Sequence, residues 1–296
     1  MNDIGATLEQ IRIMKGITVT SIAKGSNYSR TNYYKLIRTN DADMMTKTFF
    51  AMLDQLTVTL DEFEYIKAHN QLPPFERWTR DMQQAFNNPK FSTTDKVMAL
   101  QQIKQQAQAE YEESHITKFR HLVIMVDLFM NRLQASPMGP ALKKEAAEIS
   151  KYLAKVNTWT HYDIVLFSNT MFAIPDAIQT SLLHSVFKNK DNYQDYPALI
   201  SEIFMFTTNL VILGVQRHQP HQVHDRVMNL KQLTLQPDAA LERIILQFCE
   251  GLDDYLSKSD LTMAKCTTAI QMTQQLGMPK WTAIFNNILD EAQKIQ

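Results

Sequence analysis

The most constraining feature of this sequence is the regular spacing of prolines between long stretches of helical periodicity. After residue 75, turn-like segments recur as SPMGP (136–140), IPD (174–176), HQP (218–220), QPD (236–238) and GMPK (277–280). Proline suits the first position of a helix, because the N–H that it lacks has no partner there. With only seven glycines and ten prolines in 296 residues, the chain disfavours a many-turned β fold. The pattern therefore predicts an all-α protein of serial helices.

Helices of 14–20 residues joined by short turns pack as antiparallel neighbours, and serial pairs of this kind form an α-solenoid. The last pair comes nearest to a tetratricopeptide pattern, with small Ala264 and Ala269 for close helix approach. A globular helical bundle has the same local signature. The helices are expected at about 75–87, 93–111, 115–134, 138–155, 159–172, 175–188, 195–217, 220–234, 238–256, 258–276 and 279–295.

The first 68 residues predict a separate group of five short helices. Gly16 suits a helix C-terminus, and Thr18 and Ser29 are good N-caps for the two helices that follow. Helix, glycine-containing turn and helix within about twenty residues have the size of a helix-turn-helix unit. The five helices are expected at about 3–15, 19–24, from 30 onward, 46–55 and 60–67.

The third of these helices has two faces of different chemistry. With Ser29 as N-cap, Tyr33, Leu36 and Ile37 fall on one face, as core residues should. The N-terminal residues of a second helix-turn-helix helix are those that reach base edges in the major groove. We therefore expect DNA contacts from residues of this helix and of the helix starts beside it. The candidates are Arg30, Thr31 and Lys35 at bases, with Arg12, Thr18, Thr20 and Arg38 near phosphates.

Charge is unevenly distributed in this region, although the whole chain has a net charge of only −1. Residues 10–40 contain six basic residues and no Asp or Glu, whereas residues 41–66 contain six acidic residues and one lysine. A basic patch confined to one element is typical of a nucleic-acid footprint. Six cations in such a segment can also form an ordinary solvated face.

Three segments resemble the Rgg/GadR/MutR family of peptide-responsive transcription regulators. They are TVTSIA (18–23), LDQLTVTLDEF (53–63) and YLAKVNTWTHYDIVLFSNT (152–170). The resemblance implies an XRE-type helix-turn-helix domain at 1–68 and a tetratricopeptide-like peptide-sensing and dimerisation domain at 76–296. The polar, double-proline segment HNQLPPF (69–75) reads as the linker between them. One departure is Ile37-Arg38-Thr39, where the family usually has Glu-Arg-Gly. A second is one extra residue expected between Thr39 and Phe49.

The family resemblance also implies two partners besides duplex DNA. One is a second copy of the chain, in a homodimer. The other is a short signalling peptide bound on the concave face of the repeats, where side-chain amides can satisfy an extended backbone. If the first helix of each pair lines that face, the candidates are Arg120, Asn131, Asn169, Asn209 and Arg217. A lining of apolar side chains such as Phe167 and Phe206 is equally open.

The sequence offers little for catalysis, and no cofactor is expected. It contains no GxGxxG, GxxxxGK[ST] or GxSxG motif. His218, His221 and His224 could hold a metal only with partners that the sequence does not identify, so a polar helix start is the simpler interpretation. Cys249 and Cys266 are expected to be buried structural thiols.

No signal-peptide core or membrane span is expected either. The longest apolar run, at 204–215, is too short to cross a bilayer. We therefore expect a cytoplasmic transcription regulator that is not an enzyme. The alternative is a helical-repeat interaction scaffold whose head no longer binds DNA.

Overall fold

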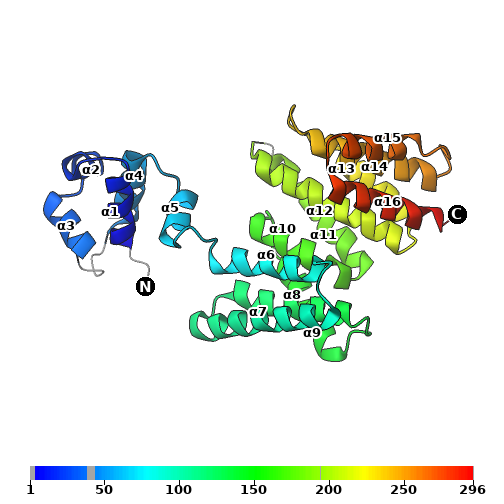
Figure 1. Ribbon diagram of the computed structural model, residues 1–296, viewed down its shortest axis with the longest axis horizontal. Coiled ribbons are helices and arrows are strands. Elements are labelled where there is room, and N and C mark those ends of the chain that lie inside the picture. Colours follow the sequence, from blue (N-terminus) through cyan, green and yellow to red (C-terminus); the bar gives the residue numbers. More distant parts are fainter. Residues whose placement is uncertain (1–3, 39–43, 194, 296) are drawn as a thin grey trace. The chain divides into compact units, whose positions relative to one another are not determined.

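The computed structural model describes residues 4–38, 44–193 and 195–295, and it is all-helical over these ranges (Figure 1). The chain forms two compact units, Met1–Leu122 and Val123–Gln296. The helices of the head are α1 (Ile4–Met14), α2 (Val19–Gly25), α3 (Arg30–Arg38), α4 (Thr46–Leu56) and α5 (Leu60–Lys67). The remaining α-helices are α6 (Pro74–Asn87), α7 (Thr93–Ser114), α8 (Thr117–Leu133), α9 (Pro140–Leu153), α10 (His161–Thr170), α11 (Asp176–Lys188), α12 (Pro197–Gln216), α13 (Pro220–Lys231), α14 (Ala240–Leu256), α15 (Ala264–Gln275) and α16 (Pro279–Gln293). Short 3-10 helices follow α10 and α11, at Met171–Ala173 and Lys190–Tyr193.

The predicted helix ends are mostly confirmed, because local chemistry sets them. Pro140, Pro197, Pro220 and Pro279 each start a helix in the first-turn position that proline tolerates. Gly16 ends the first helix region with φ +65°, a left-handed conformation that glycine adopts without strain. The segment that connects α5 to α6 spans residues 68–73. The domain limits at 68 and 76 remain a prediction from the sequence.

One predicted helix start is wrong. We expected a helix from residue 258, whereas α15 begins at Ala264. The side chain of Asp260 accepts hydrogen bonds from the backbone N–H of Thr262 (2.8 Å) and from its hydroxyl (2.7 Å). Lys258 and Met263 have positive φ angles of 60° and 56°. Local side-chain bonds of this kind compete with helix formation, so the turn is longer than the apolar pattern indicates.

The head folds around one small core to which all five helices contribute. Helix α1 packs on α3 and α5, and α2 packs on α3 and α4. Gly5 permits the α1–α3 approach, since a Cβ there would lie 2.3 Å from the carbonyl oxygen of Leu36. The buried core consists of Leu8, Ile11, Ile22, Tyr33, Leu36, Met52, Leu53, Leu56 and Phe63.

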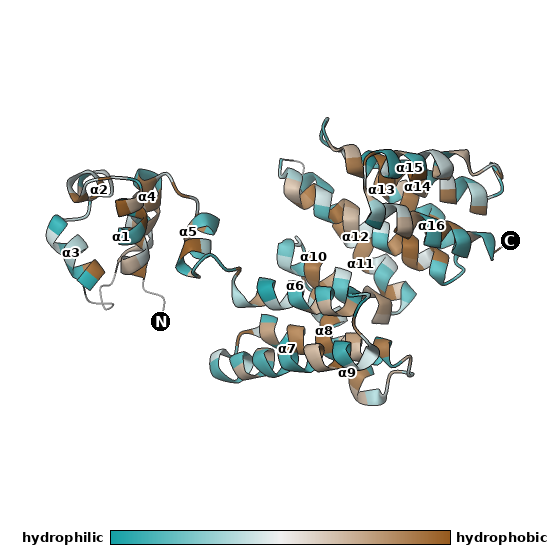
Figure 2. Cartoon of the chain, viewed as in Figure 1, coloured by the Kyte–Doolittle hydropathy of each residue, from teal (hydrophilic) through white to brown (hydrophobic). Residues whose placement is uncertain are grey.

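The second unit is organised around α12, whose neighbours are α10, α13, α14 and α16. Apolar residues run along this helix (Figure 2). The helix has 20 residues, and an 18-residue stretch of it has a mean hydropathy of 1.8, which by length and composition alone would allow it to cross a membrane. However, 67% of that stretch is buried inside the protein. The apolar run at 204–215 is thus part of the longer helix α12, which lies in the core.

The segment 152–170, which carried part of the family resemblance, forms the end of α9, a connecting loop and α10. Trp159 is 1% exposed, and its ring packs against Phe167 and Phe206 at centroid distances of 5.3 and 6.1 Å. The backbone N–H of Trp159 donates to the hydroxyl of Tyr193 at 2.8 Å. The resemblance in this segment therefore reflects the packing of a core rather than a binding surface.

The last helices form tetratricopeptide-like antiparallel pairs, in which α14 packs on α15 and α15 on α16. Helices α14 and α15 approach closely at Gly251 of α14, where a Cβ would lie 2.7 Å from Sγ of Cys266 and 2.8 Å from its backbone nitrogen. Ala269 is fully buried in α15, as expected, whereas Ala264 is exposed. Sequence reasoning did not identify Gly251 as a contact position, because the pattern within one helix does not show which residue faces a neighbouring backbone.

We predict that Gly251→Ala destabilises the second unit. Alanine normally favours a helix over glycine by about 1 kcal/mol, but here its methyl group would clash with Cys266, and overpacking of this kind costs about 1–3 kcal/mol. The matched control is Gly139→Ala, at the N-cap of α9, where an added Cβ meets nothing within 4 Å. Urea unfolding followed by circular dichroism should show a larger fall in the midpoint for Gly251→Ala than for Gly139→Ala, which loses only the preference of an N-cap for glycine over alanine. Equal midpoints would mean that α14 and α15 separate without cost.

Candidate functional site

Helix α3 presents two distinct faces, as the sequence predicted. Tyr33 and Leu36 are 0% and 4% exposed and belong to the core of the head. The hydroxyl of Ser29 accepts a hydrogen bond from the N–H of Asn32 (3.1 Å), which confirms Ser29 as a cap. The exposed residues of the helix are Arg30, Thr31, Asn32, Tyr34, Lys35 and Arg38. This face is polar and cationic, with three basic residues and no acidic one.

Two of the exposed basic residues of α3 are the arginines Arg30 and Arg38. The guanidinium of Arg38 lies over the ring of Tyr34, 5.8 Å from its centroid, a cation–π geometry that also leaves the charge at the surface. No carboxylate among the described residues pairs with Arg30 or Arg38. Their charges therefore remain available to an anionic partner.

The start of α2 carries the two threonines that the sequence assigned to phosphates. The hydroxyl of Thr18 accepts a hydrogen bond from the N–H of Ser21 (3.1 Å), so it caps the helix as predicted. The side chain of Thr20 is exposed. Thr18 thus has a structural role in the head, and Thr20 is the freer of the two hydroxyls.

Arg12 is held inside the head rather than presented to solvent. Its Nε and Nη2 donate to the two carboxylate oxygens of Glu9 at 2.7 and 2.6 Å, and its Nη1 donates to the carbonyl oxygen of Ile17 at 2.6 Å. The hydroxyl of Tyr33 donates to the same carboxylate at 2.9 Å. Hydrogen bonds from Arg12 outweigh partial burial and lower the pKa of Glu9. This network joins α1 to α3 and orients the exposed face of α3.

The same network bears on the departure at Ile37-Arg38-Thr39. Ile37 is half-buried against the core of the head, in place of the family's carboxylate. Glu9 of α1 supplies a carboxylate that braces α3 through Tyr33. Thr39 and residues 40–43, part of the segment before Phe49 that was expected to carry one extra residue, lie outside the described residues.

The five residues predicted to bind peptide have different environments. Arg120 is half-buried and lies in the first compact unit, and the other four lie in the second. Asn131 on α8 is half-buried, and Asn209 on α12 is exposed. Asn169 is 5% exposed, and its side-chain amide donates to the carbonyl oxygen of Val165 in its own helix (2.7 Å).

Arg217 belongs to a polar cluster at the C-terminal end of α12. It donates to the carboxylate of Asp176 and, at 2.7 Å, to the carbonyl oxygen of Phe172. The side chain of Gln219 donates to the same carboxylate at 2.6 Å. Burial alone would raise the pKa of Asp176, but these hydrogen bonds and the charge of Arg217 lower it. Arg217 therefore ties α12 to the start of α11.

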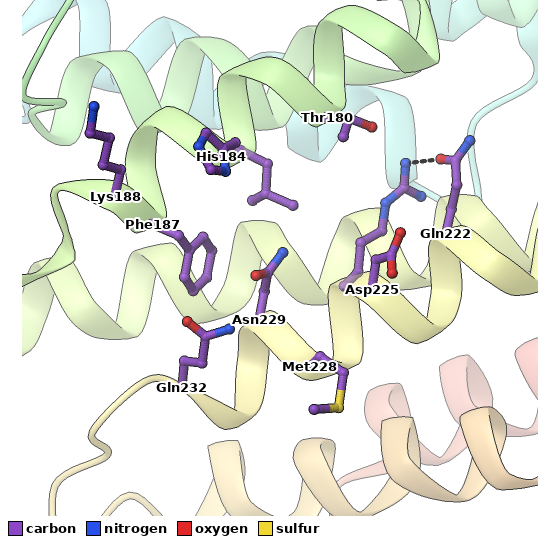
Figure 3. Close-up of a pocket in the computed structure, with 11 residues that line it drawn as sticks. Thr180, His184, Phe187, Lys188, Gln222, Asp225, Met228, Asn229 and Gln232 are labelled. Carbon is purple, nitrogen blue, oxygen red and sulfur yellow. Dashed lines mark hydrogen bonds between the residues drawn. The ribbon is translucent and has the colours of Figure 1, made fainter.

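A groove of about 580 Å³ lies between α11 and α13 (Figure 3). None of the five predicted peptide residues lines it. Sequence reasoning missed this groove, although amide side chains repeat along one face of α13. Its lining residues are Thr180, Leu183, His184, Phe187, Lys188, Gln222, Asp225, Arg226, Met228, Asn229 and Gln232.

The structure also places the histidines considered for metal and the two cysteines. Within the described ranges, no group of three His, Cys, Asp or Glu residues is placed to hold a metal ion. His224 instead approaches the carboxylate of Asp253 at 3.0 Å. Cys249 and Cys266 are free and buried, as predicted. Burial raises the pKa of the Cys266 thiol to about 12, which keeps it unreactive.

Together, a helix-turn-helix head and tetratricopeptide-like helical pairs define the class of helical-repeat transcription regulators. The model of the HTH-type transcriptional regulator Rgg, C-terminal domain, matches residues 100–287, which is more than half of the chain. The chain therefore belongs to the Rgg family. No curated protein sequence matches it.

Solved structures agree in fold over nearly the whole chain. A protein from Listeria monocytogenes EGD-e has a TM-score of 0.79 at 17% identity, covering 98% of this chain and 97% of its own. The Streptococcus dysgalactiae SHP pheromone receptor Rgg2 has a TM-score of 0.72 at 15% identity, with coverage of 97% and 99%. PrgX in its complex with cCF10 has a TM-score of 0.70 at 12% identity, with coverage of 99% and 93%. At these identities the similarity shows the shared fold.

We predict a pH-dependent stabilisation of the head by Glu9. Because the folded-state pKa of Glu9 is lowered below its ordinary value of 4.5, its contribution is present above about pH 4.5 and is lost as the pH falls through the lowered pKa. Glu9→Gln should therefore cost about 1 kcal/mol at pH 7, and less as the pH approaches 3. Urea unfolding of both proteins between pH 7 and pH 3 measures the difference.

The matched control is Glu64→Gln on α5, where the carboxylate pairs with Lys67 at 3.4 Å on the surface. Exposed pairs of this kind contribute little. A cost for Glu9→Gln that is constant with pH, or no larger than that for Glu64→Gln, would contradict a bracing role for the network.

Proposed function

We propose that this chain is a sequence-specific DNA-binding transcription regulator, controlled by a short signalling peptide that binds the concave face of its helical repeats. The observation that carries the DNA part is the exposed cationic face of α3, held by Tyr33 and Leu36 in the core and by the Glu9 network. In this proposal Arg30, Thr31 and Lys35 read bases, and Arg38, Thr18 and Thr20 lie near phosphates.

Arg12 differs from the other candidate DNA contacts, because its side chain is already bonded within the head. Its guanidinium is bonded to Glu9 and to the carbonyl oxygen of Ile17, so a phosphate could reach it only by replacing one of these partners. We therefore propose that Arg12 acts indirectly, by orienting α3. Its substitution should weaken binding of all DNA sequences alike.

Family membership supports the regulatory part, and two neighbours support peptide control. One is described as an SHP pheromone receptor, and the other was solved as a PrgX/cCF10 complex. We propose that Asn131 and Asn209 contact the peptide directly, because their side chains are not fully buried. Arg120 is proposed as a further contact, whereas Asn169 and Arg217 would first have to leave the internal partners described above.

The proposal includes homodimerisation and a cytoplasmic, non-catalytic protein. A symmetric operator requires two reading helices, and a dimer supplies them. Peptide control requires that the peptide bind one of two dimer states more tightly than the other. The second candidate function is a scaffold whose head has lost DNA binding, which the Ile37-Arg38-Thr39 departure favours.

We predict that Arg30→Ala weakens and relaxes binding to promoter DNA. Loss of a bidentate contact to guanine should remove about 1–3 kcal/mol of discrimination. Fluorescence anisotropy with duplex from the protein's own promoter and with scrambled duplex, at about 50 to 200 mM salt, measures both affinity and salt dependence. The matched control is Lys67→Ala on the acidic side of the head.

The two candidate functions give opposite results in this assay. A regulator binds its promoter steeply with salt and prefers it over scrambled duplex, and Arg30→Ala loses that preference while Lys67→Ala keeps it. The assay is also run with the low-mass fraction of spent culture medium, as a source of the short signalling peptide. Absence of DNA binding with and without this fraction would reject the regulator and leave the scaffold.

For the peptide part, we predict that Asn209→Ala reduces the effect of that low-mass fraction on DNA affinity by several-fold, since one amide contact is worth about 1 kcal/mol. DNA affinity in the absence of peptide should not change. Gln216→Ala, exposed at the end of the same helix, is the control. An unchanged response in Asn209→Ala would remove this residue from the peptide site.

A further inference from the structure

Tyr33 and Tyr34 are adjacent in α3, but their side chains have opposite environments. Tyr33 is 0% exposed, and its hydroxyl donates to the carboxylate of Glu9 at 2.9 Å. Tyr34 is 40% exposed, and its hydroxyl has no hydrogen-bond partner among the residues that the structure describes. A phenolic hydroxyl can donate as well as accept, so that of Tyr34 is available to a partner outside the chain.

The ring of Tyr34 is held by two neighbouring side chains. The ring of Tyr33 meets it edge-on, with centroids 6.3 Å apart and planes at 77°. The guanidinium of Arg38, one turn further along the helix, lies over the ring with Cζ 5.8 Å from its centroid. An edge-on ring pair and a cation over a ring face are both favourable geometries. Tyr34 thereby links the exposed Arg38 to the buried Tyr33, which the Glu9 network holds in place.

The guanidinium of Arg38 keeps its hydrogen-bond donors for a ligand. Within the described ranges it forms no ion pair and no hydrogen bond. A guanidinium has five N–H donors in a fixed fork, which matches the oxygens of a phosphate. The contact with Tyr34 restricts the side chain of Arg38 without giving its N–H groups an acceptor. A group that is ordered in advance loses less entropy when it binds.

The place of these two residues in the helix favours a backbone phosphate as the ligand. Residues at the N-terminal end of the second helix of a helix-turn-helix unit reach base edges, and Arg38 is the last residue of α3. From Thr31 to Arg38 the helix rises about 10 Å, at about 1.5 Å per residue. Tyr34 lies between them at helical spacing, on the same side of the helix. A helix whose start enters the major groove therefore brings this end toward the sugar-phosphate backbone.

We propose that Tyr34 and Arg38 form one phosphate-binding pair, in which the hydroxyl of Tyr34 and the guanidinium of Arg38 donate to oxygens of the same DNA phosphate. Tyr34 is also a positioning residue, because its ring orients Arg38. The pair depends on the DNA binding proposed above for α3, to which it adds Tyr34 as a contact. Because a phosphate carries no sequence information, the pair contributes equally to binding of every duplex.

The test measures binding of the full chain to promoter duplex and to scrambled duplex by fluorescence anisotropy, at about 50 to 200 mM salt. The variants are Tyr34→Phe and Arg38→Ala, singly and together. Tyr34→Phe keeps the ring under Arg38 and removes only the hydroxyl. The matched control is Tyr65→Phe on α5, where the tyrosine is 46% exposed. Both tyrosines are at the surface, so the urea midpoints of these two variants should equal that of the wild type.

We expect Tyr34→Phe to weaken binding about threefold to tenfold, by the same factor on both duplexes, as for the loss of one hydrogen bond. The salt dependence should not change, because the hydroxyl carries no charge. Arg38→Ala should weaken binding of both duplexes and reduce the slope of log affinity against log salt by about 1. In the Arg38→Ala background, Tyr34→Phe should cost less than about twofold, since residues that share one partner are not additive. Tyr65→Phe should bind like the wild type.

The phosphate-binding pair is overturned if Tyr34→Phe binds both duplexes as tightly as Tyr65→Phe does, or if the effects of Tyr34→Phe and Arg38→Ala multiply independently. Weaker binding of the promoter duplex alone would make Tyr34 a base-reading residue, and would also overturn the pair. Failure of the proposed DNA-binding function gives a different result, because the wild-type chain would then bind neither duplex. The pair would fall with it.

Discussion

Burial of α12 is the constraint on which the second unit depends. A helix that is apolar on nearly every side cannot face water, so helices must cover it all round. It is covered by α10, α13, α14 and α16. Its buried hydroxyls cost little, because Thr207 and Thr208 donate to carbonyl oxygens one turn earlier in the same helix, at 2.8 and 3.0 Å. The arrangement of helix pairs follows from the need to cover this one element.

In the head, polar and backbone contacts add to the apolar core that holds α3. Two devices supplement it. Gly5 lets the backbones of α1 and α3 approach closely, and Glu9 accepts hydrogen bonds from both Arg12 and Tyr33. Both act on the inner side of α3. On its outer side, Arg30 and Arg38 are exposed and pair with no carboxylate among the described residues.

The surfaces available for binding are what remains after the fold has satisfied its own polar groups. Asn169 and Arg217 bond to carbonyl oxygens within the protein, and Arg12 bonds to Glu9. Asn229 has the same side chain as Asn169, yet among the described residues its amide has no hydrogen-bond partner, at the edge of a groove. Residue type alone does not separate these cases, because an unpaired polar group in the interior is costly and folding pairs it wherever a partner is near.

The sequence by itself determined the all-α class, the helix-turn-helix head and most helix ends. These depend on hydrogen bonds and steric effects within a few residues, as at Thr18, Ser29 and Pro279. Only the tertiary structure decided that Gly251 meets Cys266, that Arg226 joins α13 to α12, and that a groove separates α11 from α13. The physical reason is range. Backbone preference acts along the chain, whereas packing and pairing depend on groups that come together only when distant helices meet.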